Sequence, residues 1–420
     1  MNWSRPCLLV LLLLAPAALQ AALPAFNLNF EVLPHVASLV STSDGGLAVL
    51  GFGWGAGSPE KVGVSVVRLD AQGRKRWQRD LDVRTYDPED RGPGLQTAGN
   101  LLQTPDGGFV FTAQGTHMWV ITRLSASGVV TWQRKLPFKG FVQAGSVHLN
   151  ADGSLLAAFP ADAENRGFSV GKPDLWVLHL NAAGQTLSQR SLPGAGFKDL
   201  LAVGNNNHFR GLPSAFLVPQ GRDILLVYQL FGFGFRVTTL AQDGTPKGSR
   251  DVLKLKERAD LLLLGAGPTR DGGLAIQCTS SRNALGTGYS HAVFARLDAS
   301  GQEIWSRGYM GRYLHLYPGG MAETPSGGYA LIFGDGFGHF TFRLADSEGV
   351  VRMERTFDET EKHPCDISQL LARSDGSCVI GGAWTPMYGS DRAKRMWVFT
   401  LDAEGRNPAL KELAPAKGRR

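Results

Sequence analysis

The chain has 420 residues, of which 43% are hydrophobic and 19% charged, and its formal net charge at pH 7 is +6. These values exclude extended disorder, and because basic residues are dispersed among nearly as many acidic ones, nucleic acid is a poor default partner. The 53 glycines fit a fold of short strands joined by tight turns.

The first residues have the layout of a secretory signal peptide. Arg5 precedes an apolar run over 8–14, and small residues follow as far as Ala22. This run is too short to span a bilayer comfortably, but a signal peptidase can accommodate the alanines. We therefore expect residues 1–21 to be removed on export and residues 22–36 to form an N-terminal segment. The mature chain is expected to be secreted or periplasmic, with no transmembrane anchor.

Three cysteines follow the signal peptide, namely Cys278, Cys365 and Cys378. Three thiols allow at most one internal disulfide, so the chain is not a scaffold held together by disulfides. A Cys365–Cys378 bridge is one option, and buried free thiols within strands are the favoured one. Neither a Cys-x-x-Cys pair nor histidines at ligand spacing occur, so no metal site is predicted.

One short motif returns along the chain. "LDAQGRKRWQR" begins at residue 69, "LSASGVVTWQR" at residue 124 and "LDASGQEIWSR" at residue 297. Seven matches have turn glycines 48 to 60 residues apart: Gly73, Gly128, Gly184, Gly244, Gly301, Gly349 and Gly405. A second turn, such as "TSDGGLAVL" at residue 42, precedes most copies, and the fourth unit is degenerate there. A period near 55 residues with strand-like segments indicates a propeller or a solenoid.

Each repeat unit contains four predicted strands separated by glycine turns. In the first unit we expect strands at 37–41, 47–52, 64–69 and 76–81. The Asp-Gly pairs between them tolerate the positive φ angles that tight hairpins need. Four antiparallel strands form a blade, and no helical periodicity competes with this interpretation. We therefore predict an all-β fold, a single seven-bladed β-propeller over 37–413, followed by a basic tail at 414–420.

The repeat resembles a known family. The Leu-Asp-Ala-x-Gly-x-x-x-Trp string of residues 69–77 resembles the repeat of pyrroloquinoline-quinone-type β-propellers, and "TPDGGFVFT" at residue 104 is similar to repeats of exported bacterial propellers. The resemblance covers about residues 37–413 and implies the fold. Such propellers include redox enzymes, assembly factors and binding modules, so it implies no single activity. Residues 104–111 also fit loosely the Asp box of sialidases, which is itself a structural turn remote from catalysis.

Three units carry a tryptophan four residues after the turn glycine. The pairs are Gly73 with Trp77, Gly128 with Trp132, and Gly301 with Trp305. A flat side chain on the outer strand can cover the turn and pack against the next blade, burying about 150–250 Å². We therefore predict a structural role for these six residues.

The C-terminal repeat predicts how the ring closes. "DAEGRNPALKEL" at residue 402 aligns without a gap on "DAQGRKRWQRDL" at residue 70. We expect the C-terminus to supply the outer strand of the seventh blade. Residues 26–33 would then be free to add an edge strand or a cap.

The irregular connections are where we expect function. In a four-stranded meander both glycine turns lie on one face of the ring, and the irregular connections lie on the other. Variable loops on a rigid scaffold often carry function. The candidate ligand-binding residues are aromatic, arginine and histidine side chains of these connections: Trp54, Tyr86, Arg91, Arg166, His208, Arg210, Tyr289, His291, Tyr313, His315, Trp384 and Tyr388.

The predicted function is binding. We expect a module that recognises a protein, peptide or glycan of the cell envelope or medium through the irregular-loop face, without a cofactor. The sequence contains no Ser-His-Asp order, carboxylate pair or calcium loop distinctive enough to name a catalytic residue. The alternative is an enzyme on the same scaffold, either a hydrolase or lyase of an extracellular polymer or a quinone-type oxidoreductase.

Overall fold

The structure is a computed structural model of the whole chain. It describes the residues that form the blades and their turns: 27–30, 35–54, 62–81, 97–115, 118–139, 142, 145–161, 174–192, 215–230, 234–253, 261–280, 292–309, 317–334, 339–358, 365–384, 395–408 and 410–413. The expected signal peptide and basic tail lie outside these residues and stay predictions. Within the described residues, no helix is long and apolar enough to cross a membrane.

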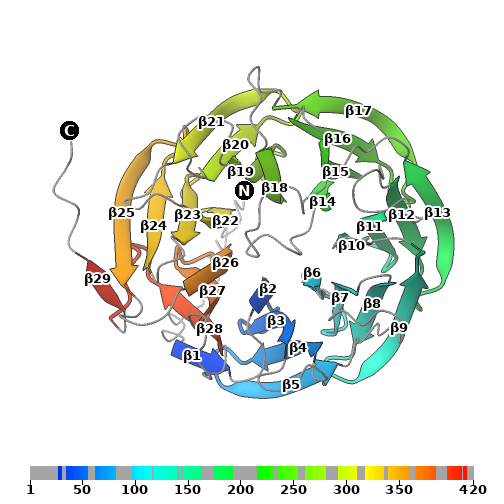
Figure 1. Cartoon of the computed structure of the whole chain (residues 1–420), viewed down its shortest axis with the longest axis horizontal. Helices are drawn as coiled ribbons and strands as arrows, with labels where there is room; N and C mark the ends of the chain where they lie inside the picture. Colours follow the sequence, from blue (N-terminus) through cyan, green and yellow to red (C-terminus); the bar gives the residue numbers. More distant parts are fainter. Residues whose placement is uncertain are drawn as a thin grey trace, which may run out of the picture.

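Seven antiparallel sheets stand around a common centre, which confirms the all-β, seven-bladed propeller (Figure 1). From the centre outward, blade 1 consists of β2 (His35–Ser41), β3 (Leu47–Trp54), β4 (Val62–Leu69) and β5 (Lys75–Leu81). Blade 2 consists of β6 (Thr97–Gln103), β7 (Phe109–Gln114), β8 (Met118–Leu124) and β9 (Val130–Pro137). Blade 3 consists of β10 (Ser146–Leu149), β11 (Leu155–Ala161), β12 (Asp174–Leu180) and β13 (Thr186–Leu192).

The remaining blades repeat this order. Blade 4 consists of β14 (Ala215–Gln220), β15 (Asp223–Leu230), β16 (Gly234–Leu240) and β17 (Pro246–Val252). Blade 5 consists of β18 (Leu261–Pro268), β19 (Leu274–Ser280), β20 (Ala292–Leu297) and β21 (Glu303–Tyr309). Blade 6 consists of β22 (Tyr317–Glu323), β23 (Tyr329–Gly334), β24 (His339–Ala345), β25 (Val351–Asp358) and the added β29 (Lys411–Leu413). Blade 7 consists of β26 (Cys365–Ala372), β27 (Cys378–Trp384), β28 (Arg395–Leu401) and β1 (Asn27–Phe30).

The hydrophobic core lies between the blades. Both faces of each middle strand are apolar, as in the fully buried β7 and β11. The buried side chains form seven clusters, and each cluster joins two neighbouring blades. One of them packs Val36 and Leu47 of blade 1 against Val379 and Val398 of blade 7, so the ring is closed by the same apolar contact that joins the other blades.

The innermost strands are also joined by side-chain hydrogen bonds. Leu101 N–H donates to Ser38 Oγ across the blade 1–2 boundary at 3.1 Å. Asn100 bonds both backbone groups of Val147, donating to its carbonyl at 2.7 Å and accepting from its N–H at 2.8 Å. Leu217 N–H likewise donates to Ser146 Oγ between blades 3 and 4. Leu263 N–H donates to Gln229 Oε1 of β15 between blades 4 and 5. These bonds fix the heights of blades 1 to 5 relative to one another.

The structure corrects the expected closure of the ring. The outer strand of blade 7 is β1, which pairs antiparallel with β28 from Asn27 opposite Phe399 to Phe30 opposite Met396. The C-terminal strand β29 pairs instead with β25 of blade 6, with Lys411 opposite Asp358. The prediction that residues 402–413 complete blade 7 was therefore wrong.

The physical reason lies in the sequence Asn407-Pro408. The preceding turn forms as in the other repeats, with Gly405 N–H donating to the Asp402 carbonyl at 2.9 Å. Asn407 Nδ2 then donates to the Thr400 carbonyl at 2.8 Å, a backbone group of β28 beside which the outer strand would run. Pro408 has no N–H to offer a ladder, and Asn-Pro favours a turn. The chain consequently leaves blade 7 and reaches the edge of blade 6.

Two of the three cysteines of the described strands are free thiols. Cys278 and Cys378 are buried free thiols, in agreement with the favoured option. Along the β26–β27 pair, Cys365 is opposite Trp384 whereas Cys378 is opposite Ala372, so the two cysteines begin opposite ends of the hairpin. Burial raises the pKa of the Cys378 thiol to about 12, which keeps it protonated and unreactive at neutral pH.

The two chain ends should differ in their contribution to stability. Deleting residues 411–420 removes three ladder residues and the exposed Arg355–Glu412 and Lys411–Asp358 pairs, so we expect a loss of about 1 kcal/mol. Deleting residues 22–30 leaves β28 as an open edge, and we expect a loss of about 3 kcal/mol or more. Urea unfolding of both variants measures this difference. A larger loss from the C-terminal deletion would contradict the closure described here.

Candidate functional site

The two edges of the blades have different connections. On one edge, every connection between consecutive strands spans five residues, except the two-residue link of Gly221 and Arg222. Each five-residue turn is closed by the same two backbone bonds. In the first turn, Thr42 N–H donates to the Gly46 carbonyl at 3.0 Å and Gly45 N–H to the Thr42 carbonyl at 2.9 Å. We call this edge the turn face. The other edge, called the loop face, carries connections as long as residues 193–214.

Ion pairs tie the turns to the third strands on the turn face. Arg123 of β8 pairs with Asp106 at 2.8 Å, and equivalent pairs join Arg68 to Asp44 and Arg296 to Asp271. The hydrogen bond from Thr104, together with the Arg123 guanidinium, lowers the pKa of the Asp106 carboxyl. These aspartates therefore stay ionised and hold their turns.

Further hydrogen bonds on the turn face cross from blade to blade. Arg123 donates to the Ala182 carbonyl at 2.8 Å, and Arg270 donates to the Pro325 carbonyl at 2.6 Å. The same kind of bond runs from Asn150 Nδ2 to the Gln242 carbonyl and from Gln220 Nε2 to the Gly272 carbonyl. Turn carbonyls of the following blades are thus occupied by protein donors.

The tryptophans extend these blade-to-blade contacts. Trp77 Nε1 of blade 1 donates to the Ala126 carbonyl of the next turn at 2.9 Å, and a Cβ added to Gly128 would lie 2.9 Å from its ring. Trp132 lies in the same way over the turn of Gly184 and Trp305 over the turn of Gly349. Gly73 and Gly301 adopt the same positive φ as these glycines. Each ring covers the turn of the following blade.

An arginine two residues further on has a related role that the sequence analysis missed. Arg307 donates to the Glu348 carbonyl at 2.9 Å and Arg355 to the Glu404 carbonyl at 2.7 Å. In the third blade, Arg190 donates to Thr245 Oγ1 at 3.0 Å. The signal was present, because an arginine stands six residues after the turn glycine in six of the seven repeats: Arg79, Arg134, Arg190, Arg250, Arg307 and Arg355.

One cluster on the turn face resembles a catalytic triad without the geometry of one. His179 Nε2 is 3.1 Å from Ser154 Oγ, but that hydroxyl donates its proton to Asp152 at 2.6 Å. A nucleophilic serine must instead donate to the histidine. His179 occupies the repeat position of Arg68 and Arg123, so the cluster is the third blade's version of the turn ion pair.

Most of the sequence-predicted ligand residues lie outside the described residues. Two of them end described strands on the loop face, since Trp54 is opposite Val62 and Trp384 is opposite Arg395. The others lie in connections beyond the described ranges: Tyr86, Arg91, Arg166, His208, Arg210, Tyr289, His291, Tyr313, His315 and Tyr388. Their proposed role in binding stays a prediction.

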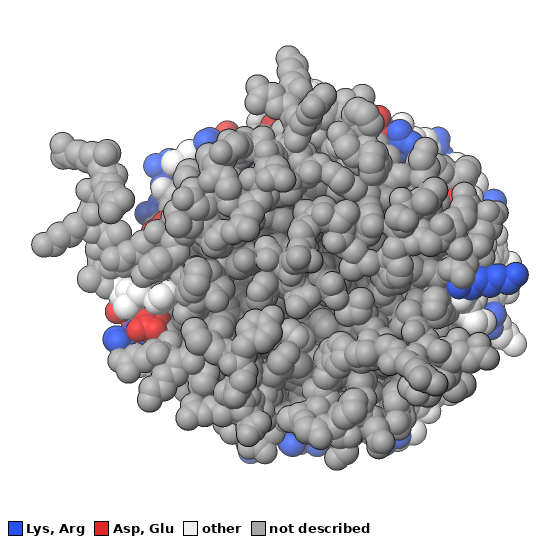
Figure 2. Space-filling view, viewed as in Figure 1, with Lys and Arg blue, Asp and Glu red and all other residues white. Residues whose placement is uncertain are grey.

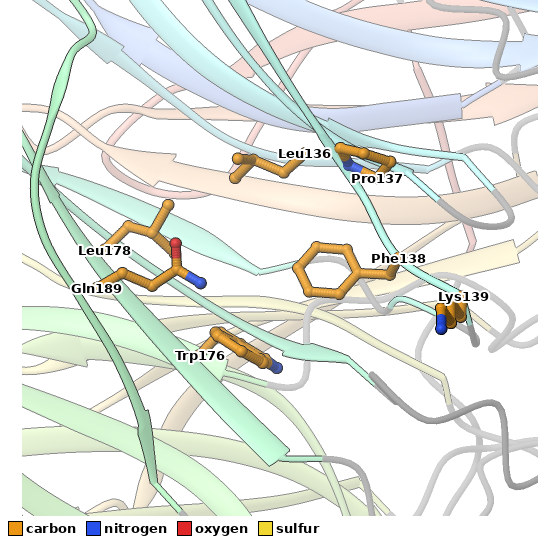
Figure 3. Close-up of a pocket in the computed structure, with 7 residues that line it drawn as sticks. All are labelled: Leu136, Pro137, Phe138, Lys139, Trp176, Leu178 and Gln189. Atoms are coloured by element: carbon orange, nitrogen blue, oxygen red, sulfur yellow. The ribbon is translucent and has the colours of Figure 1, made fainter.

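A pocket of about 330 Å³ opens between blades 2 and 3, at the loop-face end of their outer strands (Figure 3). The end of β9 forms one wall, and β12 with β13 forms the other. Its lining residues are Leu136, Pro137, Phe138, Lys139, Trp176, Leu178 and Gln189. Sequence reasoning missed this pocket because its walls come from two consecutive repeats and meet only in the folded ring.

No group of three or more histidine, cysteine or acidic side chains that could hold a metal occurs among the described residues.

No protein-family model matches the chain, and no curated protein matches it.

Solved structures share the fold. One of them is a polysaccharide lyase, an ulvan lyase bound to a glucuronate–sulfated rhamnose unit. It is 10% identical to this chain, with a TM-score of 0.56, and the match covers 92% of this chain and 98% of the lyase. A protein from Lactobacillus plantarum is 13% identical with a TM-score of 0.49, covering 78% and 85%. The β-propeller domain of the trilobed protease from Pyrococcus furiosus, with an open velcro topology, is 10% identical with a TM-score of 0.47, covering 92% and 98%. At 10% identity, the likeness to the ulvan lyase shows the propeller fold alone.

Glycines at the turn face can test the tryptophan contact. Gly128 (φ +81°) lies under Trp77, whereas Gly272 (φ +80°) would have nothing within 4 Å of an added Cβ. Gly272→Ala should cost only the backbone strain, about 1 kcal/mol. Gly128→Ala should cost about 1–3 kcal/mol more because the methyl group meets the indole. Urea unfolding measures both, and equal costs would show that the ring does not hold the turn.

The turn carboxylates should make the ring acid-sensitive. The pKa of Asp106 is lower in the folded than in the unfolded state, so its stabilisation is present above the ordinary value of 3.8 and is lost as pH falls through the folded value. We expect the free energy of unfolding to drop between pH 5 and about pH 3. Asp106→Asn keeps an acceptor oxygen without the charge, so its drop should be smaller. An unchanged drop would assign the acid sensitivity to other groups.

Proposed function

We propose that the propeller is an exported, non-catalytic binding module that recognises a protein, peptide or glycan of the cell envelope or medium through its loop face. The difference between the two edges of the blades supports this proposal. On the turn face the connections are uniform, and on the loop face they run to 22 residues at 193–214. Uniform connections are what a scaffold needs, and variable ones suit recognition.

The hydrogen bonding of the turn face supports the same assignment. Asp106 is paired with Arg123, and the carbonyls of Ala182 and Pro325 already accept protein donors. A ligand on this face would compete with those partners. A ligand on the loop face would meet connections rich in aromatic and arginine side chains, the residue types that contribute most to binding at interfaces.

Rigidity is the advantage that the ring gives to such a face. Loops anchored at both ends on neighbouring strands lose less conformational entropy on binding than free segments do. Because the seven apolar clusters hold the blades together, the strand ends from which these connections start keep fixed mutual positions. This allows one ligand to be contacted by several blades at once.

Paired alanine substitutions on the loop face test the proposal. The variants Tyr86→Ala with Arg91→Ala, and Tyr313→Ala with His315→Ala, should leave the thermal midpoint unchanged. Each pair should reduce capture of the partner, identified by mass spectrometry from envelope or medium extracts, by about tenfold or more. The matched control is Arg222→Ala, an exposed arginine in the two-residue link of the turn face.

Two results would contradict the proposal. Capture that survives both loop-face pairs and fails in Arg222→Ala would assign recognition to the turn face. Turnover of an extracellular polysaccharide by the purified chain, abolished by the loop-face pairs, would make the protein a hydrolase or lyase.

A further inference from the structure

The pocket between blades 2 and 3 departs from the repeat at one position. Eight residues before the turn glycine, the third strand of most blades carries a side chain that faces the preceding blade. In three blades this side chain is bonded to its partner on the outer strand: Ser65 to Asp80 at 2.6 Å, Arg236 to Asp251 at 2.7 Å and Thr341 to Thr356 at 3.1 Å. In blade 3 the equivalent residue is Trp176, opposite Ser191.

The indole of Trp176 is only partly covered. Phe138 packs edge-to-face against it at 5.7 Å and against Phe159 at 5.4 Å, which fixes one side of the pocket. Trp397 occupies the same repeat position in blade 7, where it is fully buried between Phe340 and Phe399. The same side chain is therefore core in one blade and a pocket wall in the other.

The polar groups around the pocket are suited to a hydroxylated ring. Trp176 Nε1 is buried and has no hydrogen-bond partner among the described residues, and a buried donor without a partner costs about 1–3 kcal/mol. The Gln189 amide, on the same wall as Trp176, offers both a donor and an acceptor (Figure 3). An indole face next to such groups binds the C–H face of a sugar while its hydroxyls are hydrogen-bonded.

One exposed cation lines the pocket. It is Lys139, and Arg134 precedes Leu136 by two residues on the same face of β9. Arg190 of β13 instead donates to Thr245 of blade 4. Asp174 lies two residues before Trp176 at the start of β12. In Figure 2 the visible described Lys and Arg side chains lie along the outer rim of the ring, and described Asp and Glu side chains lie there too. An anionic substituent on the sugar would be attracted to the Lys139 ammonium at the pocket.

We propose that the pocket between blades 2 and 3 binds a carboxylated sugar unit of an acidic polysaccharide. The sugar ring lies against Trp176, Gln189 bonds its hydroxyls, and the Lys139 ammonium pairs with its carboxylate. A volume near 330 Å³ is at the lower end of ligand pockets and suits a single ring rather than a long chain segment. The site is separate from the loop-face candidates, so it does not rest on the function proposed above.

Calorimetric titration with an oligogalacturonate, and with its uncharged methyl ester, tests this inference on the chain from residue 22 onward. We expect the acid to bind and the ester to bind more weakly. Lys139→Gln should weaken binding of the acid about fivefold, with little effect on the ester. Lys135→Gln is the matched control, because Lys135 is exposed on β9, four residues before Lys139, and does not line the pocket.

Two further variants test the pocket walls. Trp176→Phe keeps an aromatic ring and removes the buried donor, and Gln189→Ala removes the amide; each should weaken binding of the acid, by about tenfold for Trp176→Phe. An unchanged thermal midpoint shows that the variants are folded. The loop-face pair Tyr313→Ala with His315→Ala should leave binding of the acid unchanged.

The inference would be overturned by any of three results. The first is failure of the acid to bind the unaltered chain. The second is a loss of binding in Lys135→Gln as large as that in Lys139→Gln. The third is abolished binding in the loop-face pair with binding preserved in the pocket variants. The last result would support recognition of glycans by the loop face and remove the pocket as a site. Loss of partner capture in the loop-face pairs, with binding of the acid intact, would support both sites independently.

Discussion

The apolar contact between adjacent blades is the interaction on which the rest of the structure depends. A single four-stranded sheet is apolar on both faces of its middle strands, as β7 and β11 show, and cannot cover those faces by itself. Each blade is therefore stable only between two neighbours, and the last must meet the first. The cluster that contains Val36 and Val379 provides this final contact. Apolar burial alone does not fix the position of one blade relative to the next. The hydrogen bonds of the inner strands and the tryptophans that cover the next turns fix that position.

The closing strand shows how far a repeat can be followed by sequence alone. The period, the strands of the first blade and the glycine turns could all be predicted, because each is a local pattern of apolar residues and turn residues. The closure could not, because the C-terminal repeat aligns without a gap, and the consequence of its Asn407 and Pro408 for the strand pairing appears only in the structure. Those two residues replace a ladder donor by a turn, and β1 from the other end of the chain pairs with β28 instead. The pairing between β1 and β28, which are far apart in the chain, thus depends on two neighbouring residues near the C-terminus.

The candidate site was predictable in part for the same reason. Connection lengths follow directly from the repeat, so the division into a uniform face and a variable face could be anticipated, as could the tryptophans that follow the turn glycines. The arginine six residues after the turn glycine, present in six of the seven repeats, was overlooked, and its contacts with the following turn show why it recurs. The pocket beside Trp176 was beyond reach, because it depends on Phe138 from one repeat meeting a strand of the next.

The propeller also explains why one groove can acquire a role that its neighbours lack. Seven grooves with the same backbone differ only in the side chains at equivalent positions, so a substitution at one of them changes a single groove without disturbing the ring. Where Ser65 or Arg236 bonds its partner on the outer strand, the groove is filled by its own polar contacts. Where a tryptophan stands and its surroundings cover it, as at Trp397, the groove becomes core. At Trp176 neither occurs, because Ser191 opposite is too small to cover the indole and the chain after β9 turns past it as Phe138 and Lys139. The pocket is thus a direct result of removing one paired side chain from a scaffold whose stability comes from the other interfaces.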